Sequence, residues 1–125
     1  MKRAAALLVP GLVLANSAVS DTSQPVMTAA DLQQICVAQD TTSKNVCRVY
    51  ILGITQGVSI GLDIADGKSS TTRPCIPQKL SGEELADSIK ARLAPSLAAS
   101  PKDRDMDAAK FVAGVMSKSF PCRKP

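Results

Sequence analysis

The chain has 125 residues, with 15 Lys and Arg against 11 Asp and Glu, and a formal net charge of +4 at neutral pH. It contains no Trp, one Tyr and two Phe, so no set of aromatic side chains is available to stack nucleic-acid bases. Because the positive charge is small and scattered, nucleic acid is not expected as a partner.

The first 20 residues have the layout of a secretory signal peptide. Lys2 and Arg3 form a positive start, residues 4–15 are almost wholly apolar, and Ala18-Val19-Ser20 places small residues where a signal peptidase cuts. A membrane anchor is the alternative, but crossing a bilayer takes about 20 apolar residues. We expect residues 1–20 to be removed near Ser20 during export, leaving a mature chain with 13 basic and 11 acidic residues and no membrane attachment.

An arm and a first helix follow the signal. Residues 21–27 are polar and contain a proline, which indicates a flexible arm. Thr28 and Asp31 form a capping-box pattern, and apolar residues recur at helical spacing after it, which predicts a helix over 29–39. Residues 28–125 are expected to form one domain.

The longest predicted helix covers 44–65. Residues 40–43 have turn chemistry, and Ser43 is a suitable N-terminal cap. Apolar side chains recur along one face of this segment, at Cys47, Ile51, Ile54, Val58, Leu62 and Ala65.

Beside this apolar stripe, Tyr50 is followed by three glycines that are four residues apart, Gly53, Gly57 and Gly61. A glycine in a helix interior costs about 1 kcal/mol relative to alanine, so we expect something to lie very close to this side of the backbone. Close packing of another helix of the same bundle is the first interpretation. A dimer seam or a groove for a partner is the second.

A third helix is predicted after a rigid connection. Residues 74–77 contain two prolines and should be extended. Ser81 and Glu84 form a second capping box, and the apolar positions after it predict a helix that Pro95 kinks or ends.

A last helix is predicted from Ser100 and Pro101, which supply a cap and a proline at the first helical position. Asp103 and Asp105 suit its positive end, and residues 120–122 close it. Because no strand-like alternation of useful length occurs, the predicted fold is all-α, a compact bundle of about four helices.

Cys36, Cys47, Cys75 and Cys122 lie in the mature part of an exported chain, where a disulfide framework is the expected state. Four cysteines allow three pairings, and we favour Cys36 with Cys47 and Cys75 with Cys122. In the chain-entropy model these bonds contribute roughly 3 and 4 kcal/mol, respectively. A zinc site is disfavoured because the chain has no C-x-x-C pair and no His.

Catalytic chemistry is not expected. Without His the chain cannot form a Ser-His-Asp or Cys-His arrangement. The remaining candidates are carboxylates, which are better explained as solvated charge and complements to helix dipoles: Asp63, Asp66, Asp103, Asp105 and Asp107. We expect no cofactor, and a function carried by the protein surface.

Three short motifs in a fixed order suggest a family. They are Cys47-Arg-Val-Tyr50-Ile-Leu-Gly53, Cys75-Ile-Pro77 and Phe120-Pro-Cys122. Over residues 32–122 the chain resembles the Rap/Tai family, the periplasmic immunity proteins that protect bacteria against type VI secretion amidase effectors. The resemblance implies a small helical fold, often dimeric, that blocks the active site of an enzyme cutting peptidoglycan peptides.

The leading hypothesis is therefore a periplasmic immunity protein whose partner is a cell-wall amidase, with a homodimer as a further possibility. The alternative is a periplasmic chaperone or stress-response binding protein. For the partner-binding surface we select one polar loop, with an ordinary solvated loop as the alternative interpretation: Lys68, Ser69, Ser70, Thr71, Thr72 and Arg73.

Overall fold

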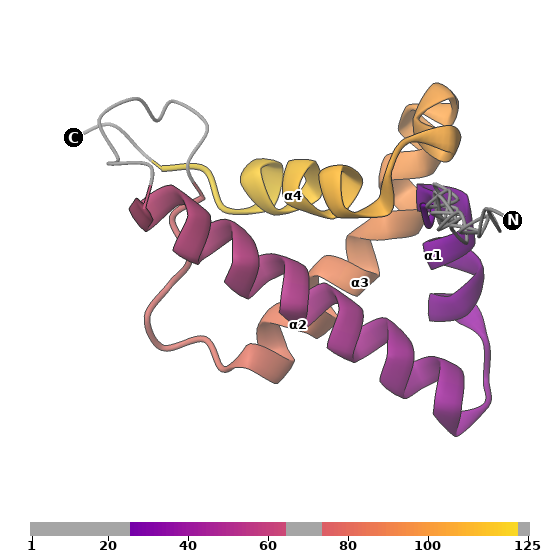
Figure 1. The fold of residues 1–125 in the computed structure, drawn as a ribbon, viewed down its shortest axis with the longest axis horizontal. Coiled ribbons are helices and arrows are strands. Elements are labelled where there is room, and N and C mark those ends of the chain that lie inside the picture. Colours follow the sequence, from indigo (N-terminus) through magenta and orange to yellow (C-terminus); the bar gives the residue numbers. More distant parts are fainter. Residues whose placement is uncertain (1–25, 65–73, 123–125) are drawn as a thin grey trace, which may run out of the picture.

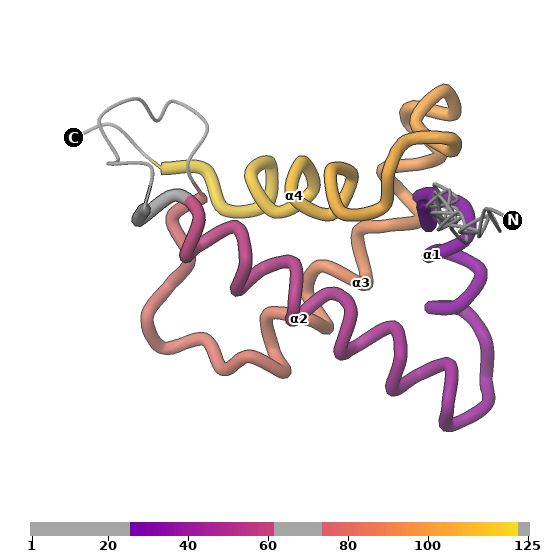
Figure 2. Tube along the Cα trace, in the orientation of Figure 1, coloured from indigo at the N-terminus to yellow at the C-terminus, as the bar shows by residue number. Residues whose placement is uncertain are grey.

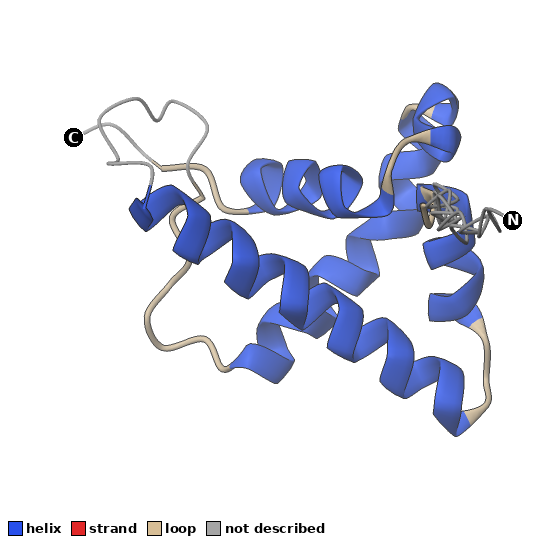
Figure 3. Cartoon of the chain, viewed as in Figure 1, coloured by secondary structure: helices blue, strands red, loops and turns tan. Residues whose placement is uncertain are grey.

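The computed structural model describes residues 26–64 and 74–122, apart from the side chains of residues 62–64. These segments fold into four α-helices and one 3₁₀ helix (Figures 1 and 3): α1 (Ala29–Val37), α2 (Thr41–Ile64), α3 (Gly82–Ala99), η1 (Pro101–Asp105) and α4 (Ala108–Ser119). Within these segments there is no β-strand, only two isolated β-bridges. The all-α prediction is confirmed.

Helix α2 is the centre of the packing and contacts α1, α3 and α4. Figure 2 shows it running along most of the length of the molecule, with α3 crossing behind it. Every α-helix contributes to one shared hydrophobic core, whose largest fully buried apolar side chains are Leu32, Ile51, Ile89, Leu93, Val112 and Met116. None of the helices in the described part of the chain is both long and apolar enough to span a bilayer.

Two helix starts were predicted correctly from their capping boxes. The amide of Thr28 donates to the Asp31 carboxylate at 3.0 Å, and the Asp31 amide donates back to the Thr28 hydroxyl at 3.2 Å. Ser81 and Glu84 form the same reciprocal pair at the start of α3, with distances of 2.8 and 3.2 Å. Each box satisfies amides that have no partner inside the helix, which is why this local pattern locates a helix start.

The connection between α1 and α2 is shorter than predicted. Helix α1 ends at Val37, two residues early, because Ala38 is extended. Helix α2 begins at Thr41, three residues before the predicted start, because the carboxylate of Asp40 accepts a hydrogen bond from the amide of Ser43 at 2.8 Å. Asp40 is therefore the cap, and the prediction that Ser43 caps this helix was wrong.

The predicted last helix is split into η1 and α4. The break lies at Met106, whose backbone is extended, and at Asp107, whose backbone is also non-helical. There the amide of Ala29 donates to the Met106 carbonyl at 2.8 Å, and the amide of Ala108 donates to the Met27 carbonyl at 2.9 Å. This pairing with the residues that precede α1 is a tertiary contact, so local sequence patterns could not reveal it.

Helix α3 continues through Pro95, so this proline does not end the helix as the sequence had allowed. The Pro95 nitrogen cannot donate to the carbonyl one turn earlier, and the residue lies on the exposed side of α3. The apolar positions around it keep the helix in place, since Leu93 and Leu97 are buried.

The disulfides have the pairing favoured from the sequence. Cys36 and Cys47 join α1 to α2 inside the core, with Cα atoms 5.0 Å apart and exposed fractions of 3% and 0%. Cys75 and Cys122, with Cα atoms 4.9 Å apart, lie on the surface. The second bond is supported by a hydrogen bond from the Cys75 amide to the Phe120 carbonyl at 2.7 Å.

Candidate functional site

The three glycines of α2 are not packed against another helix of the bundle. A Cβ atom built on Gly53, Gly57 or Gly61 would meet no neighbouring atom within 4 Å. The first interpretation of these glycines, close packing inside the bundle, is therefore wrong. The other helices lie against the opposite side of α2, where Ile51 and Thr55 are buried.

One exposed face of α2 carries no charge over about four turns, whereas the exposed Arg48 lies on another face and pairs with Glu83. We define the outer face of α2 as five exposed residues spaced alternately three and four apart: Val46, Val49, Gly53, Gln56 and Ile60. Its three apolar side chains are 43%, 66% and 59% exposed, respectively. A surface helix normally places charged or polar residues on this side, so the outer face of α2 has the character of an uncovered contact surface.

Tyr50 does not belong with the glycines. Its side chain is partly buried against the hydrophobic core. Burial raises the pKa of its hydroxyl above the usual value of 10.0, and the negative charge of Asp107 raises this pKa further. Asp107 in turn caps α4 by accepting a hydrogen bond from the Lys110 amide at 3.0 Å. Tyr50 therefore packs beside the start of α4.

The predicted partner loop, residues 68–73, lies outside the described residues, as do the side chains of Asp63 and Asp66. Within the described segments no group of three or more His, Cys, Asp or Glu side chains could hold a metal ion, and no described cysteine is free. Two of the carboxylates near η1 have different structural roles. Asp107 caps α4, and Asp103 lines a groove that is described next.

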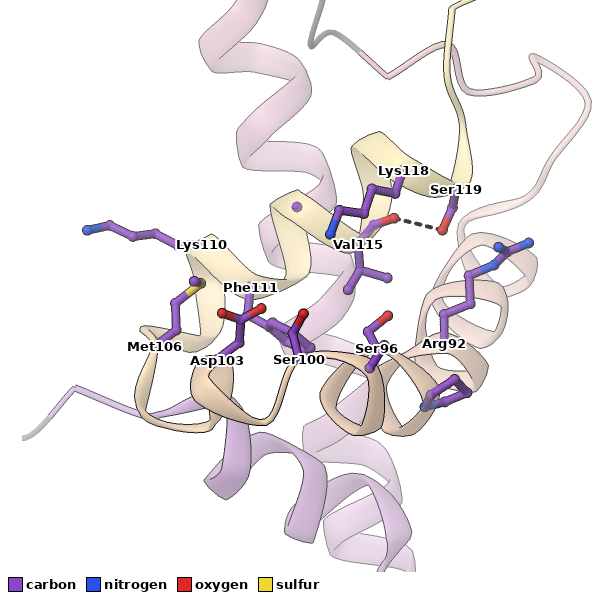
Figure 4. Close-up of a pocket in the computed structure, with 13 residues that line it drawn as sticks. Arg92, Ser96, Ser100, Asp103, Met106, Lys110, Phe111, Val115, Lys118 and Ser119 are labelled. Carbon is purple, nitrogen blue, oxygen red and sulfur yellow. Dashed lines mark hydrogen bonds between the residues drawn. The ribbon is translucent and has the colours of Figure 1, made fainter.

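This groove lies between α3, η1 and α4 and has a volume of about 400 Å³ (Figure 4). We call it the α3–α4 groove. It is lined by Pro95 and Ser96 from α3, and by Phe111 and Val115 from α4. Gly114 also lines it, and a Cβ atom built there would meet nothing within 4 Å.

Four ionisable side chains border the α3–α4 groove. Arg92, Lys110 and Lys118 are cationic and Asp103 is anionic, so the net charge of the lining is +2. Figure 4 shows Arg92 and Lys110 on opposite sides of the groove and pointing outward, with Lys118 lying along α4 between them. A ligand in this groove would therefore meet an apolar floor inside a mainly positive border.

A smaller hollow of about 250 Å³ lies between α2 and the start of α3. Its lining is uncharged and includes Leu52 and Leu85. The hydroxyl of Thr55 donates to the Leu52 carbonyl at 2.9 Å, so this buried polar group has a partner. Gln56 and Ile60 line the same hollow and also belong to the outer face of α2, which makes the two features one continuous uncharged surface.

The sequence analysis did not identify the α3–α4 groove. Its lining residues come from three elements, and their proximity depends on how α3 and α4 pack. Two local signals were available: Gly114 interrupts an otherwise amphipathic helix, and Pro95 stands inside α3. Neither signal alone shows that the two residues share a surface.

Comparison with known proteins gives one match. A protein-family model described as Rap1a immunity proteins matches residues 28–122, which is most of the chain and includes all described helices. No curated protein and no solved structure matches the chain. The chain belongs to the Rap1a immunity protein family.

Proposed function

We propose that this chain is a periplasmic immunity protein that binds a type VI secretion amidase effector and inhibits it. The match of residues 28–122 to Rap1a immunity proteins is the observation that carries the proposal. Membership of an immunity family implies that the partner is a protein effector. That the effector is an amidase rests on the order of the three cysteine-containing motifs.

The architecture is consistent with inhibition by binding and not by chemistry. The described residues present a helical bundle held by one disulfide in the core and one on the surface, together with the α3–α4 groove and an uncharged face of α2. Such a body can cover an enzyme's active site without reorganising, and a rigid surface loses little conformational entropy on binding.

Two features support action outside the cytoplasm. The first 20 residues have the order of segments that a secretory signal requires. Both pairs of cysteines are oxidised, a state that persists in the periplasm but not in a reducing cytosol. Mass spectrometry of the protein from a periplasmic extract should give a chain that starts near Asp21 with two disulfides intact.

We expect the effector to be encoded beside this gene, and the direct test uses the product of that neighbouring gene. Purified mature protein is added in increasing amounts to that effector, and the release of peptides from peptidoglycan is measured. We expect cleavage to be lost at about one equivalent, while an unrelated cell-wall amidase stays active. A neighbouring effector that is neither bound nor inhibited would contradict the proposal.

We also propose that two copies associate through the outer face of α2. This face has no charge to repel its own copy, and the open glycines allow a second helix to approach closely. Light scattering should show a dimer for the wild type and a monomer for Val49→Glu, with unchanged helicity. Ala91→Glu, at an exposed position of α3, is the matched control and should remain dimeric. A monomeric wild type would overturn this assignment.

A further inference from the structure

The α3–α4 groove combines two properties that the sequence did not predict. Its floor is formed by Phe111 and Val115, which are only 5% and 4% exposed, and its border carries three cations and one carboxylate. We propose that this groove binds a segment of the effector in which an apolar side chain is flanked by carboxylates. The inference rests on the proposed function, because it names the chemistry of the segment that the immunity protein recognises.

The floor of the groove fits an apolar anchor. Phe111 and Val115 present carbon atoms from α4, and Met106, which is 38% exposed, extends this apolar surface toward η1. Gly114 leaves the space above α4 free, because a Cβ atom there would have no neighbour within 4 Å. Interface anchors are apolar or aromatic side chains that enter such preformed hollows.

The border of the groove favours an acidic chain that passes through it. Arg92 and Lys110 point outward on opposite sides, so they can reach carboxylates on either side of an anchor but not one buried beneath it (Figure 4). Lys118 lies along α4 between them and adds a third positive charge to the border. A small molecule confined to the floor would leave the two outer cations without a partner, so the arrangement favours a protein segment.

Asp103 restricts how that segment lies. Because like charges repel, acidic side chains of the effector should keep away from Asp103 and lie near Arg92, Lys110 or Lys118. Charge complementarity of this kind fixes orientation and raises the association rate more than it raises affinity. The groove therefore selects both an acidic segment and its direction.

The first test measures affinity for the neighbouring effector by calorimetry. Gly114→Leu places a side chain in the groove. Because the space at this position is open, the melting temperature of the variant should equal or exceed that of the wild type. We expect its affinity to fall by about tenfold or more. Ala94→Leu adds the same side chain at an exposed position of α3 that does not line the groove, and should bind as the wild type does.

Charge variants test the border separately. Lys118→Glu should weaken binding by about tenfold and make the affinity less dependent on salt concentration. Lys118→Arg should keep the wild-type affinity and the wild-type salt dependence. A benzoylphenylalanine in place of Met106, which lines the groove and is 38% exposed, should cross-link on illumination to an effector peptide that contains Asp or Glu beside an apolar residue. Cross-links between two copies of this chain, or to a peptide without acidic residues, would overturn the inference.

The two proposals fail in different ways. If the wild type binds the effector and Gly114→Leu binds it equally well, the groove assignment is wrong and the immunity function stands. If the wild type does not bind the effector at all, the proposed function is overturned and the inference falls with it.

Discussion

The backbone amide of Ala108 donates a hydrogen bond to the carbonyl of Met27 at 2.9 Å, which joins the start of α4 to the residue before the cap of α1. The neighbouring bond from Ala29 to Met106, at 2.8 Å, completes an antiparallel bridge centred on Thr28 and Asp107. Two helix caps therefore lie side by side, and the stability of each helix start depends on the other.

Replacing Thr28 by Ala should lower the free energy of unfolding by about 1 kcal/mol. The variant loses the hydroxyl that accepts from the Asp31 amide at 3.2 Å and also donates to its carboxylate at 2.8 Å. Urea denaturation followed by circular dichroism measures the change. Thr42→Ala, at an exposed position in the first turn of α2, should have a smaller effect, and equal effects of the two substitutions would show that the cap is unimportant.

Stability should decrease when the pH falls below about 4. Backbone amides at three helix starts donate to the carboxylates of Asp31, Asp40 and Glu84 and hold the pKa of each below its usual value. A lowered pKa in the folded state stabilises the protein above the unfolded-state pKa, and this contribution is lost as the pH falls through the folded-state pKa. The urea concentration at the midpoint of unfolding, measured from pH 7 to pH 3, shows how stability changes with pH.

A triple variant checks the cause of that pH dependence. Asp31→Asn, Asp40→Asn and Glu84→Gln together should flatten the decrease in the urea midpoint, because none of the replacements titrates in this range. If the triple variant keeps the wild-type slope, other carboxylates are responsible.

The surface disulfide should be reduced before the core disulfide. Cys75 and Cys122 are exposed, whereas Cys36 and Cys47 are buried in the core and can be reached only after the helices separate. Mild reductant with an alkylating agent under native conditions should therefore label Cys75 and Cys122 first, as measured by peptide mass spectrometry. Simultaneous labelling of all four would indicate that reduction requires global unfolding.

Gly53→Ala and Gly57→Ala should each raise the free energy of unfolding of the monomer by up to about 1 kcal/mol. Both positions are in a helix interior, and the added methyl group would meet no atom within 4 Å. Denaturation is measured at low protein concentration, so that association does not contribute. Gly82→Ala is the control, since its methyl group would approach the Leu52 Cδ2 atom at 3.2 Å and the gain should be smaller or absent.

The sequence predicted those parts of the fold that depend on neighbours along the chain. The capping boxes at Thr28 and Ser81 located two helix starts, because the interacting groups are three residues apart. The favoured disulfide pairing was also correct, since Cys36 and Cys47 lie on either side of a short turn. The split after η1 was missed because its partner, Met27, is about 80 residues away along the chain.

The two proposed binding surfaces were harder to predict for the same reason. The glycines of α2 predicted a close approach, but the sequence could not show that no other helix of the bundle lies against them. The α3–α4 groove needs Arg92 and Lys118 on one surface, and their spacing in the sequence gives no sign of this. Helix periodicity identifies a buried face, whereas a groove exists only after two helices have packed.

Helix α4 is anchored at both of its ends by parts of the chain remote from it in sequence. Met27 holds its first residue, and beyond its last turn the Phe120 carbonyl accepts from the Cys75 amide beside the surface disulfide. The ends of a short helix normally fray. Here fraying would first have to break these hydrogen bonds to distant parts of the same chain. Amides of α4 should therefore exchange with deuterium as slowly as those of the core, so α4 should need no ordering when a partner binds to it.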